Sequence, residues 1–192
     1  MRVGLLGGTF NPIHNGHIVL AEEALRQLSL DKVIFIPTFI PPHKDPTKLI
    51  DAQHRLKMIE LAIGANPKFE ISRCEIERGQ KSYSIDTVEY FKKSYPEGTE
   101  FFFLIGADNF KKLDKWRDIN RLLTLCRFIV ADRRGFSEGL KYPGVERIKI
   151  TPVDISSTEI RRRIKSARPI TRLLPKAVED YIISNNLYKN KG

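Results

Sequence analysis

The sequence predicts an α/β protein with a mainly parallel sheet and right-handed crossovers between its strands. Three observations support this prediction. Short apolar runs alternate with segments whose apolar residues recur at helical spacing along the whole chain. The most apolar run, residues 99–107, has the unbroken hydrophobicity of a central strand that is covered on both faces. Two apolar runs end in glycine just before a helical pattern begins, which is where ligands bind in parallel sheets.

The predicted elements follow in alternating order. Strands are predicted over residues 2–8, 31–37, 69–76, 99–107, 127–133 and 145–153. Helices are predicted over residues 16–28, 51–67, 85–95, 115–125, 156–166 and 175–186. Asp51 is the expected N-cap of the second helix and Ser84 that of the third. Three prolines within residues 38–49 predict a loop there.

Composition describes an ordinary globular chain of one domain, residues 1–192. Hydrophobic residues make up 41% and charged residues 29%, and the chain has no internal repeat or low-complexity segment. No run approaches about 18 consecutive apolar residues, so no transmembrane helix is expected. The first strand starts too early to leave room for a signal peptide. Cys74 and Cys126 are too few for a disulfide framework, which predicts buried thiols in a cytoplasmic protein.

The net charge of +10 leaves two classes of partner open at this point. A basic chain can bind nucleic acid, or it can bind a small, highly phosphorylated substrate. The longest run of Lys and Arg is residues 161–163, and aromatic residues are not interleaved with the basic ones as in RNA-binding proteins. The motifs must therefore decide between a polymer and a nucleotide.

The first motif, GGTFNPIHNGH at residues 7–17, lies between the first strand and the first helix. Gly7 and Gly8 allow a ligand to approach the backbone closely, although the spacing is neither the dinucleotide fingerprint nor a phosphate loop. His14 and His17 stand at the start of the helix, where unpaired N–H groups already favour phosphate. The alternatives are a metal pair, for which no further ligands are visible, and simple helix caps.

The second motif, ISSTEIRRRI at residues 155–164, predicts another helix start suited to an anion. Ser156 has capping-box spacing, and Ser157 and Thr158 add hydroxyl groups at the same helix end. Arg161 follows within reach of the same anion. The alternative is an ordinary capped surface helix with a solvated basic face, which is the interpretation for Arg162 and Arg163.

Together the two motifs resemble the signatures of the nucleotidylyltransferase superfamily. Four further segments, at residues 41–44, 82–91, 105–118 and 174–188, are similar to segments of the bacterial nicotinate-nucleotide adenylyltransferases. The resemblance spreads over nearly the whole chain. It implies a Rossmann-like fold of the nucleotidylyltransferase type, in which the C-terminal helices at about residues 156–186 complete an ATP site.

The resemblance also implies a reaction. Members of that family join ATP to nicotinate mononucleotide, with direct attack on the α-phosphorus, no covalent enzyme intermediate and a Mg²⁺ ion that bridges the phosphates. The phosphates supply most ligands of such an ion, so no metal-binding residue is predicted. Rival acceptors are nicotinamide mononucleotide and phosphopantetheine. An RNA-binding protein is the rival class, and the choice between monomer and homo-oligomer stays open.

The resemblance carries residue roles as well. It implies catalytic roles for His14, His17 and Arg161. The implied ATP-binding residues are Gly8, Thr9, Phe10, Gly106, Asp108, Ser156, Ser157, Thr158 and Arg161. The implied residues for the acceptor are Lys44, Ser84, Thr87 and Trp116.

Each acceptor residue has a simpler alternative. Trp116 is expected to stack on the pyridine ring, or else to be a partly buried lid residue. Lys44 is expected to meet the acceptor phosphate, or to be solvated. Ser84 is expected to recognise the nicotinate carboxylate, or only to cap its helix, and Thr87 can equally serve packing.

Overall fold

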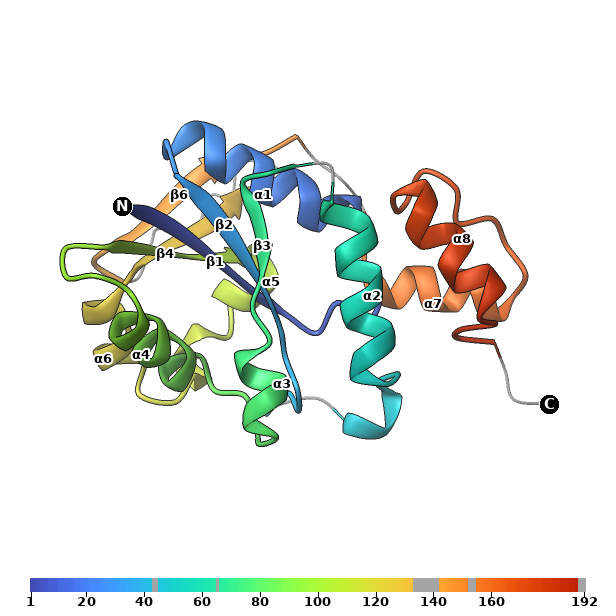
Figure 1. Cartoon of the computed structure of the whole chain (residues 1–192), viewed down its shortest axis with the longest axis horizontal. Helices are drawn as coiled ribbons and strands as arrows, with labels where there is room; N and C mark the ends of the chain where they lie inside the picture. Colours follow the sequence, from blue (N-terminus) through green and yellow to red (C-terminus); the bar gives the residue numbers. More distant parts are fainter. Residues whose placement is uncertain (43–44, 65, 133–141, 152–154, 190–192) are drawn as a thin grey trace.

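The sheet is parallel throughout the described chain, which confirms the predicted α/β class. The computed structural model describes residues 1–42, 45–64, 66–132, 142–151 and 155–189. The strands are β1 (Arg2–Gly8), β2 (Lys32–Pro37), β3 (Phe69–Ile71), β4 (Glu100–Gly106), β5 (Arg127–Asp132) and β6 (Val145–Lys149). Their order is β3-β2-β1-β4-β5-β6 (Figure 1). The order reverses between β1 and β4, and the carboxyl ends of these strands are where such sheets bind ligands.

Helices cover both faces of the sheet (Figure 1). The longer helices are α1 (Asn15–Gln27), α2 (Ala52–Ile63), α4 (Ser84–Ser94), α6 (Ile119–Leu125), α7 (Ser157–Lys165) and α8 (Lys176–Ser184). The shorter ones are α3 (Cys74–Arg78), α5 (Ala107–Phe110) and the 3-10 turns η1 (Pro46–Lys48) and η2 (Leu113–Lys115). Side chains of α1, α2, α7 and α8 share one core with the sheet, and those of α3, α4 and α6 share the other.

The two cores follow from the alternation of side chains along the central strands. Leu6 and Phe102 point into the first core, and Leu5 and Phe103 point into the second. Each of these side chains is at most 3% exposed, so each contributes about 1.5–3 kcal/mol through burial. The sheet is therefore a rigid platform for the loops at its carboxyl edge.

Residues 69–76 differ from the single strand that the sequence predicts. The strand β3 ends at Ile71, and the helix α3 begins at Cys74. The Ser72 hydroxyl accepts a hydrogen bond from the Cys74 amide at 3.4 Å, and Gly79, with φ of +67°, ends the helix. This local turn chemistry overrides the alternating pattern and carries Glu75 towards the carboxyl edge of the sheet.

The predicted helix over residues 115–125 is also wrong in its first half. Leu113 in η2 and Leu122 in α6 are fully buried and anchor the two pieces separately. Between them Trp116 is extended, with ψ of 137°, and Asp118 has φ of +52°. The predicted cap Ser84 is the first residue of α4 instead, because Tyr83 is the N-cap.

The C-terminal helices confirm the predicted elements there. Ile160 of α7 and Val178 and Ile182 of α8 are at most 1% exposed and belong to the first core. Figure 1 shows α8 beside α2, and the Tyr181 hydroxyl lies 2.9 Å from His54 Nδ1 across that contact. Strand β6 ends at Lys149, before the predicted end. No helix within the described residues is long and apolar enough to cross a bilayer.

Candidate active site

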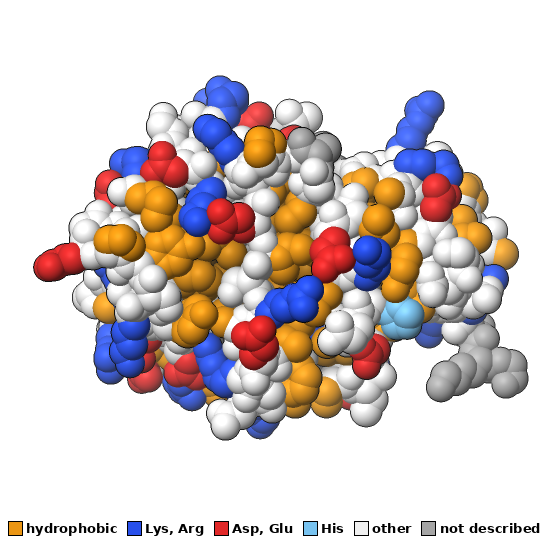
Figure 2. Space-filling view, viewed as in Figure 1, with side chains coloured by type: hydrophobic (Ala, Val, Ile, Leu, Met, Phe, Trp, Pro, Cys, Tyr) orange, Lys and Arg blue, Asp and Glu red, His pale blue; other side chains and the backbone are white. Residues whose placement is uncertain are grey.

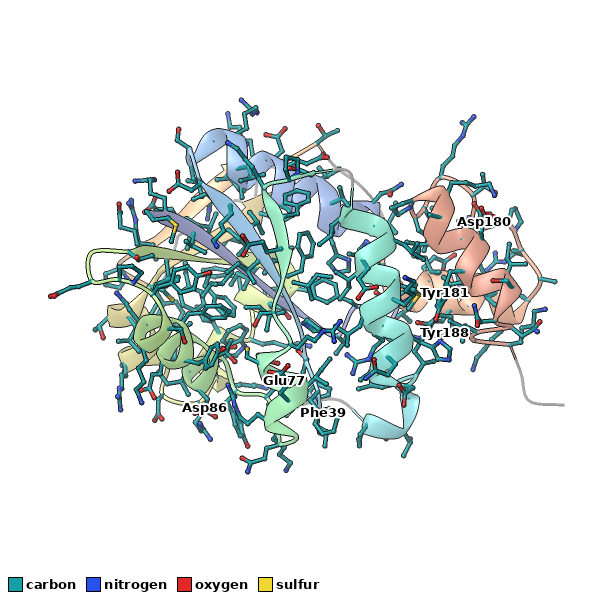
Figure 3. All side chains as sticks on the ribbon, in the orientation of Figure 1. Phe39, Glu77, Asp86, Asp180, Tyr181 and Tyr188 are labelled. Atoms are coloured by element: carbon teal, nitrogen blue, oxygen red, sulfur yellow. The ribbon has the colours of Figure 1, made fainter. Side chains whose placement is uncertain are left out.

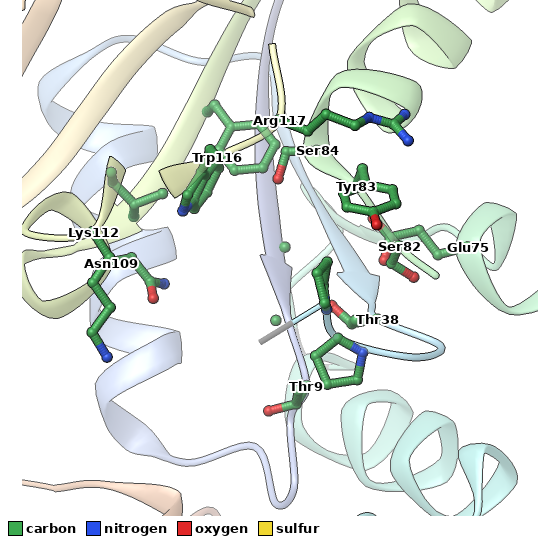
Figure 4. Close-up of a pocket in the computed structure, with 16 residues that line it drawn as sticks. Thr9, Thr38, Glu75, Ser82, Tyr83, Ser84, Asn109, Lys112, Trp116 and Arg117 are labelled. Carbon is green, nitrogen blue, oxygen red and sulfur yellow. The ribbon is translucent and has the colours of Figure 1, made fainter. Parts of the chain in front are cut away.

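Two adjoining cavities open at the carboxyl ends of β1 and β4. The larger, of about 640 Å³, is lined by His14 and His17 and is called here the histidine cavity. The smaller, of about 240 Å³, is lined by Trp116 and is called the tryptophan cavity (Figure 4). The two cavities share part of their lining, which is Gly7, Gly8, Thr9, Ile105, Asn109 and Lys112. Two ligands bound side by side would therefore meet at the first motif.

His14 and His17 form one unit at the start of α1. Their rings are stacked with centroids 3.8 Å apart, and the His14 amide donates to His17 Nδ1 at 3.2 Å. Because Nδ1 of a neutral His17 accepts, the ring proton is on Nε2, where it is a donor. His14 is 5% exposed and His17 is half-buried. The two histidines cap the helix and also line the cavity, so the cap interpretation is compatible with the prediction that they donate to a phosphate.

Phe10, which the resemblance predicts to bind ATP, lines neither cavity. It is 1% exposed, has φ of +45°, and its ring packs edge-on against His17 with centroids 5.0 Å apart. A Cβ on Gly8 would come within 3.1 Å of the Phe10 ring. Phe10 therefore packs against His17, and of these three residues predicted to bind ATP, Gly8 and Thr9 form the floor of the histidine cavity.

The second motif lies directly against the first, although the two are far apart in the sequence. The Ser156 hydroxyl accepts from the Glu159 amide at 3.2 Å, so Ser156 is the predicted N-cap of α7. The Ser157 hydroxyl donates to the Pro12 carbonyl at 2.8 Å. Ser156, Ser157 and Thr158 line the histidine cavity, so the amino ends of α1 and α7 both face it.

Arg161 joins the two motifs by its guanidinium group. Nη1 donates to the Asn11 carbonyl at 2.7 Å, and Nη2 donates to Thr158 Oγ1 at 3.2 Å. Arg162 and Arg163 instead pair with Glu159, as expected of surface residues. Arg161 is thus the arginine of α7 that reaches the histidine cavity.

The far wall of the histidine cavity comes from the end of β4. Gly106 and Asp108, both predicted to bind ATP, line it. The charged groups around the cavity are Lys48, Lys112 and Arg161 against Asp45 and Asp108, to which His14 and His17 add donors. This excess of cationic and donor groups suits a ligand with several negative charges.

The tryptophan cavity has one aromatic wall and one polar wall. Trp116 is half-buried, with its edge against Phe103 and Phe128 at centroid distances of 5.8 and 6.0 Å. Figure 4 shows Tyr83 and Ser84 on the α4 side of the cavity, with Trp116 across from them. Arg117 lies 3.9 Å above the Tyr83 ring and pairs with Asp86. The predicted acceptor residues Trp116 and Ser84 therefore share a cavity.

Thr87 does not line the cavity, so the structure gives it a supporting position rather than the predicted substrate contact. It is 1% exposed, and its hydroxyl donates to Glu75 Oε1 at 2.6 Å. Lys44, also predicted to bind the acceptor, lies outside the described residues.

Sequence reasoning missed two buried charged residues beside the cavities. Arg55 is 2% exposed; its Nη1 donates to the carbonyls of Thr9 at 3.0 Å and Thr38 at 2.6 Å, and burial lowers its pKa. Glu75 is 5% exposed and lines the tryptophan cavity, and burial raises its pKa. Arg55 could have been found, because it shares the apolar face of α2 with Met58 and Ile59 at helical spacing. Glu75 had no such signal, because its segment was predicted to be a strand.

Asn11 connects the first motif to the end of the chain. It is 2% exposed, its Nδ2 donates to the Lys48 carbonyl at 2.9 Å, and its Oδ1 accepts from the Tyr188 hydroxyl at 2.9 Å. Figure 3 shows Tyr188 on the side of the C-terminal segment that faces α2. Burial raises the pKa of Tyr188, so its hydroxyl stays protonated and donates.

Known proteins resemble this chain over nearly its full length. The family model described as Cytidylyltransferase-like matches residues 5–163. A Bacillus subtilis protein named nicotinate-nucleotide adenylyltransferase is 42% identical, over 98% of this chain and 99% of that protein. A Bacillus pumilus protein named "Probable nicotinate-nucleotide adenylyltransferase" is 46% identical over 98% and 99%. The structure of a Plasmodium falciparum nicotinic acid mononucleotide adenylyltransferase complexed with NaAD has a TM-score of 0.82 at 21% identity, covering 97% of each chain, and shares the fold.

Proposed function

The chain belongs to the family of nicotinate-nucleotide adenylyltransferases, and we propose that it transfers the adenylyl group of ATP to nicotinate mononucleotide and releases pyrophosphate. The observation that carries this proposal is the meeting of two unlike cavities at Gly8 and Thr9. The histidine cavity suits a triphosphate, and the tryptophan cavity suits a flat ring. Their common floor is where a bond between the two ligands would form.

The reaction is one displacement at phosphorus. A phosphate oxygen of nicotinate mononucleotide forms a bond to the α-phosphorus of ATP, and the bond from that phosphorus to the bridging oxygen of pyrophosphate breaks. The leaving group takes the electron pair and the negative charge. Positioning and charge neutralisation carry the rate of such a step, because little proton chemistry is needed.

His17, His14 and Arg161 are the groups that we assign to this charge. His17 lines the cavity and packs against the rings of Phe10 and His14, and its Nε2–H is the donor that we assign to the developing charge. Arg161 adds a fixed positive charge at the joint of the two motifs. Donors already held in place strengthen as charge develops and cost no reorganisation in the transition state.

The remaining polar groups of the histidine cavity hold ATP in this proposal. The amino end of α7 with Ser156, Ser157 and Thr158 receives the triphosphate, and Gly106 and Asp108 face the sugar. Because the Ser157 hydroxyl already donates to Pro12, its contribution to ATP comes through the backbone. Gly8 and Thr9 form the floor beneath the α-phosphate.

A Mg²⁺ ion fits this arrangement as a companion of ATP. Within the described ranges no three or more His, Cys, Asp or Glu side chains form a metal cluster. The ion would be held chiefly by phosphate oxygens and water, and Asp45 or Asp108 in the cavity wall would contribute through water. When bound, the ion neutralises charge on the transferred and leaving phosphates.

The two cysteines give no support to a covalent enzyme intermediate. Cys74 and Cys126 are free and buried, and burial raises the pKa of the Cys74 thiol and raises that of Cys126 to about 12. Neither cysteine lines the two cavities. Free thiols and an ATP substrate are also the reasons for proposing that the enzyme works in the cytoplasm.

The tryptophan cavity receives the pyridine nucleotide in this proposal. The pyridine ring stacks on Trp116, and Ser84 at the start of α4 faces its carboxylate. Lys44 is proposed to meet the mononucleotide phosphate.

Nucleic acid is a weaker candidate partner. On the face in Figure 2, Lys and Arg side chains are interspersed with Asp and Glu rather than gathered in a basic stripe. Arg161 and Lys112 instead converge on the histidine cavity. A polymer would need a continuous basic surface along its backbone.

The test is pyrophosphate release from ATP and Mg²⁺ with three acceptors offered separately. We expect release with nicotinate mononucleotide and much less with nicotinamide mononucleotide or phosphopantetheine. Equal release with both pyridine nucleotides would support adenylyl transfer but contradict the preference for nicotinate mononucleotide. Silence with all three, together with salt-dependent binding to arbitrary RNA, would reject the proposal.

A further inference from the structure

Glu75 is a buried acidic group that lines the tryptophan cavity and not the histidine cavity. The mononucleotide phosphate must lie at the floor shared with the histidine cavity, because it reacts there. The pyridine ring therefore extends towards Trp116, Ser84, Ser82 and Glu75, which belong only to the tryptophan cavity. Figure 4 shows Glu75 beside Ser82, on the same side of the cavity as Tyr83.

The two carboxyl oxygens of Glu75 have unequal surroundings. Oε1 accepts from the hydroxyl of Thr87 at 2.6 Å, whereas Oε2 is buried without a hydrogen-bond partner among the described residues. The hydroxyls of Ser82 and Thr38 face the carboxyl group, but neither completes a bond of normal geometry to Oε2. A buried carboxyl group with one oxygen unsatisfied needs an explanation in the ligand-bound state.

No ion pair holds Glu75 in its ionised form within the described residues. Arg78 of α3 and Arg55 of α2 attract the carboxylate, and the Arg78 attraction lowers the pKa of Glu75, but neither side chain forms an ion pair with it. The other titratable groups around it are Cys74 on its own helix and Tyr83, Arg117 and Lys112 in the cavity wall. Desolvation is the largest influence, and it raises the pKa of Glu75.

We propose that Glu75 is a specificity-determining residue. Its side chain is a neutral carboxylic acid in the wall of the tryptophan cavity, and it donates its Oε2 proton to the carboxylate of the bound pyridine nucleotide. This inference rests on the proposed function. An O–H···O⁻ bond is charge-assisted and strong, and it would satisfy Oε2. An ionised Glu75 would have the opposite effect, because it would repel a carboxylate and accept from the amide of nicotinamide.

Thr87 is the positioning residue for this acid. Its hydroxyl bonds to Oε1, and it also lies 3.3 Å from the Tyr83 carbonyl one turn earlier in α4. Thr87 thereby ties the Glu75 carboxyl group to the same helix end that presents Ser84 to the cavity. The resemblance predicts that the segment with Ser84 and Thr87 recognises the nicotinate carboxylate. In this inference Ser84 contacts the carboxylate directly, and Thr87 acts on it through Glu75.

The test uses the full-length protein and its single tryptophan. Trp116 is the only tryptophan of the chain and lines this cavity, so quenching of its fluorescence reports binding there without turnover. Nicotinate mononucleotide and nicotinamide mononucleotide are titrated against the wild type, Glu75→Gln, Glu75→Ala and Thr87→Val. Glu77→Gln, a change at an exposed residue of the same helix, is the matched control.

Glu75→Gln should bind nicotinate mononucleotide within about threefold of the wild type, because the amide keeps one donor and one acceptor. Glu75→Ala should lose about tenfold to a hundredfold in affinity for it and less for nicotinamide mononucleotide. Thr87→Val should lower the affinity for nicotinate mononucleotide relative to that for nicotinamide mononucleotide, by a smaller factor than Glu75→Ala does. Glu77→Gln should leave this ratio of affinities unchanged.

Tighter binding of nicotinate mononucleotide to Glu75→Gln would overturn the inference, because it would mean that the wild-type residue is ionised. Unchanged affinities in Glu75→Ala would overturn it as well. The infrared band of a buried protonated carboxyl group should be present in the ligand-free wild type and absent from Glu75→Gln, and its absence from the wild type would contradict the neutral acid. That readout needs no substrate, so it separates failure of this inference from failure of the proposed function.

Discussion

The histidine cavity and the tryptophan cavity are neighbours on one sheet edge, but they are built on different principles. The histidine cavity takes most of its polar residues from two compact motifs that each begin a helix and that are tied by hydrogen bonds from Arg161 and Ser157; its far wall comes from the end of β4. The tryptophan cavity collects single side chains from α3, α4 and the turn after η2. The difference teaches that a charged, chemically uniform ligand can be bound by local motifs, whereas a distinctive ring needs groups gathered from separate elements.

Removal of the His17 side chain should have the largest effect and should fall on the chemical step. The loss of one preorganised donor to developing charge costs about 10²–10³-fold in kcat, or about 2.7–4 kcal/mol. Pyrophosphate release by His17→Ala measures this, and thermal unfolding checks that the fold survives, since His17 is only half-buried. Near-normal turnover would contradict the catalytic role of His17.

Removal of the Trp116 ring should affect one substrate and not the other. Stacking of a base on an aromatic side chain contributes about 1–3 kcal/mol by alanine substitution, so Trp116→Ala should raise KM for nicotinate mononucleotide about fivefold to a hundredfold. KM for ATP should change little, and Trp116→Phe should restore most of the loss. Equal weakening of both substrates would show that Trp116 only shapes the wall between the cavities.

The Tyr188 hydroxyl should matter more to the histidine cavity than to its neighbour. Tyr188→Phe removes the 2.9 Å donor of Asn11 Oδ1 and leaves that oxygen with the Ile50 amide at 3.5 Å, so the lost hydrogen bond should cost about 0.5–1.5 kcal/mol of unfolding free energy. Because the Asn11 carbonyl also holds Arg161, KM for ATP should rise more than KM for nicotinate mononucleotide.

Tyr181→Phe is the control for this change. Tyr181 lies on the same C-terminal segment, and its hydroxyl meets His54 rather than the first motif. An equal rise in both KM values after Tyr188→Phe, or the same effect from Tyr181→Phe, would contradict a specific link between the C-terminal segment and ATP.

The same contrast explains what the sequence could predict. The βα order, the N-cap Asp51 and the placement of His14, His17, Ser156 and Arg161 follow from contiguous patterns, and the structure places these residues as expected. The roles of these residues remain predictions.

Thr87 and Phe10 are harder to assign from sequence, because their positions depend on packing against Glu75 and His17. The position of Glu75 could not be predicted, because its segment has the alternating pattern of a strand. The turn at Ser72 and the C-cap Gly79 make this segment the helix α3, and that helix brings the carboxyl group to the cavity. Long-range contacts of this kind leave no periodic trace in the sequence.

The smallest expected effect concerns the pH dependence of stability, and it belongs to the tryptophan cavity alone. Burial raises the pKa of Glu75 above the ordinary value of 4.5. Below 4.5 the carboxyl group is protonated in both the folded and the unfolded chain, so its contribution to stability is complete. As the pH rises towards the folded pKa, the unfolded chain releases the proton and the folded chain retains it, so the free energy of unfolding falls.

Glu75→Gln has no proton to release there, so its unfolding free energy relative to the wild type should grow between pH 4.5 and the folded pKa. Urea unfolding of both proteins at a series of pH values measures the difference. Carboxylates with lowered pKa values, such as Glu159 and Asp45, act in the opposite direction, but they are present in both proteins and cancel. An unchanged difference in unfolding free energy between Glu75→Gln and the wild type across this range would mean that Glu75 is an ordinary ionised carboxylate in the folded protein. The same change in Glu77→Gln would mean this as well, and the tryptophan cavity would then contain no neutral acid.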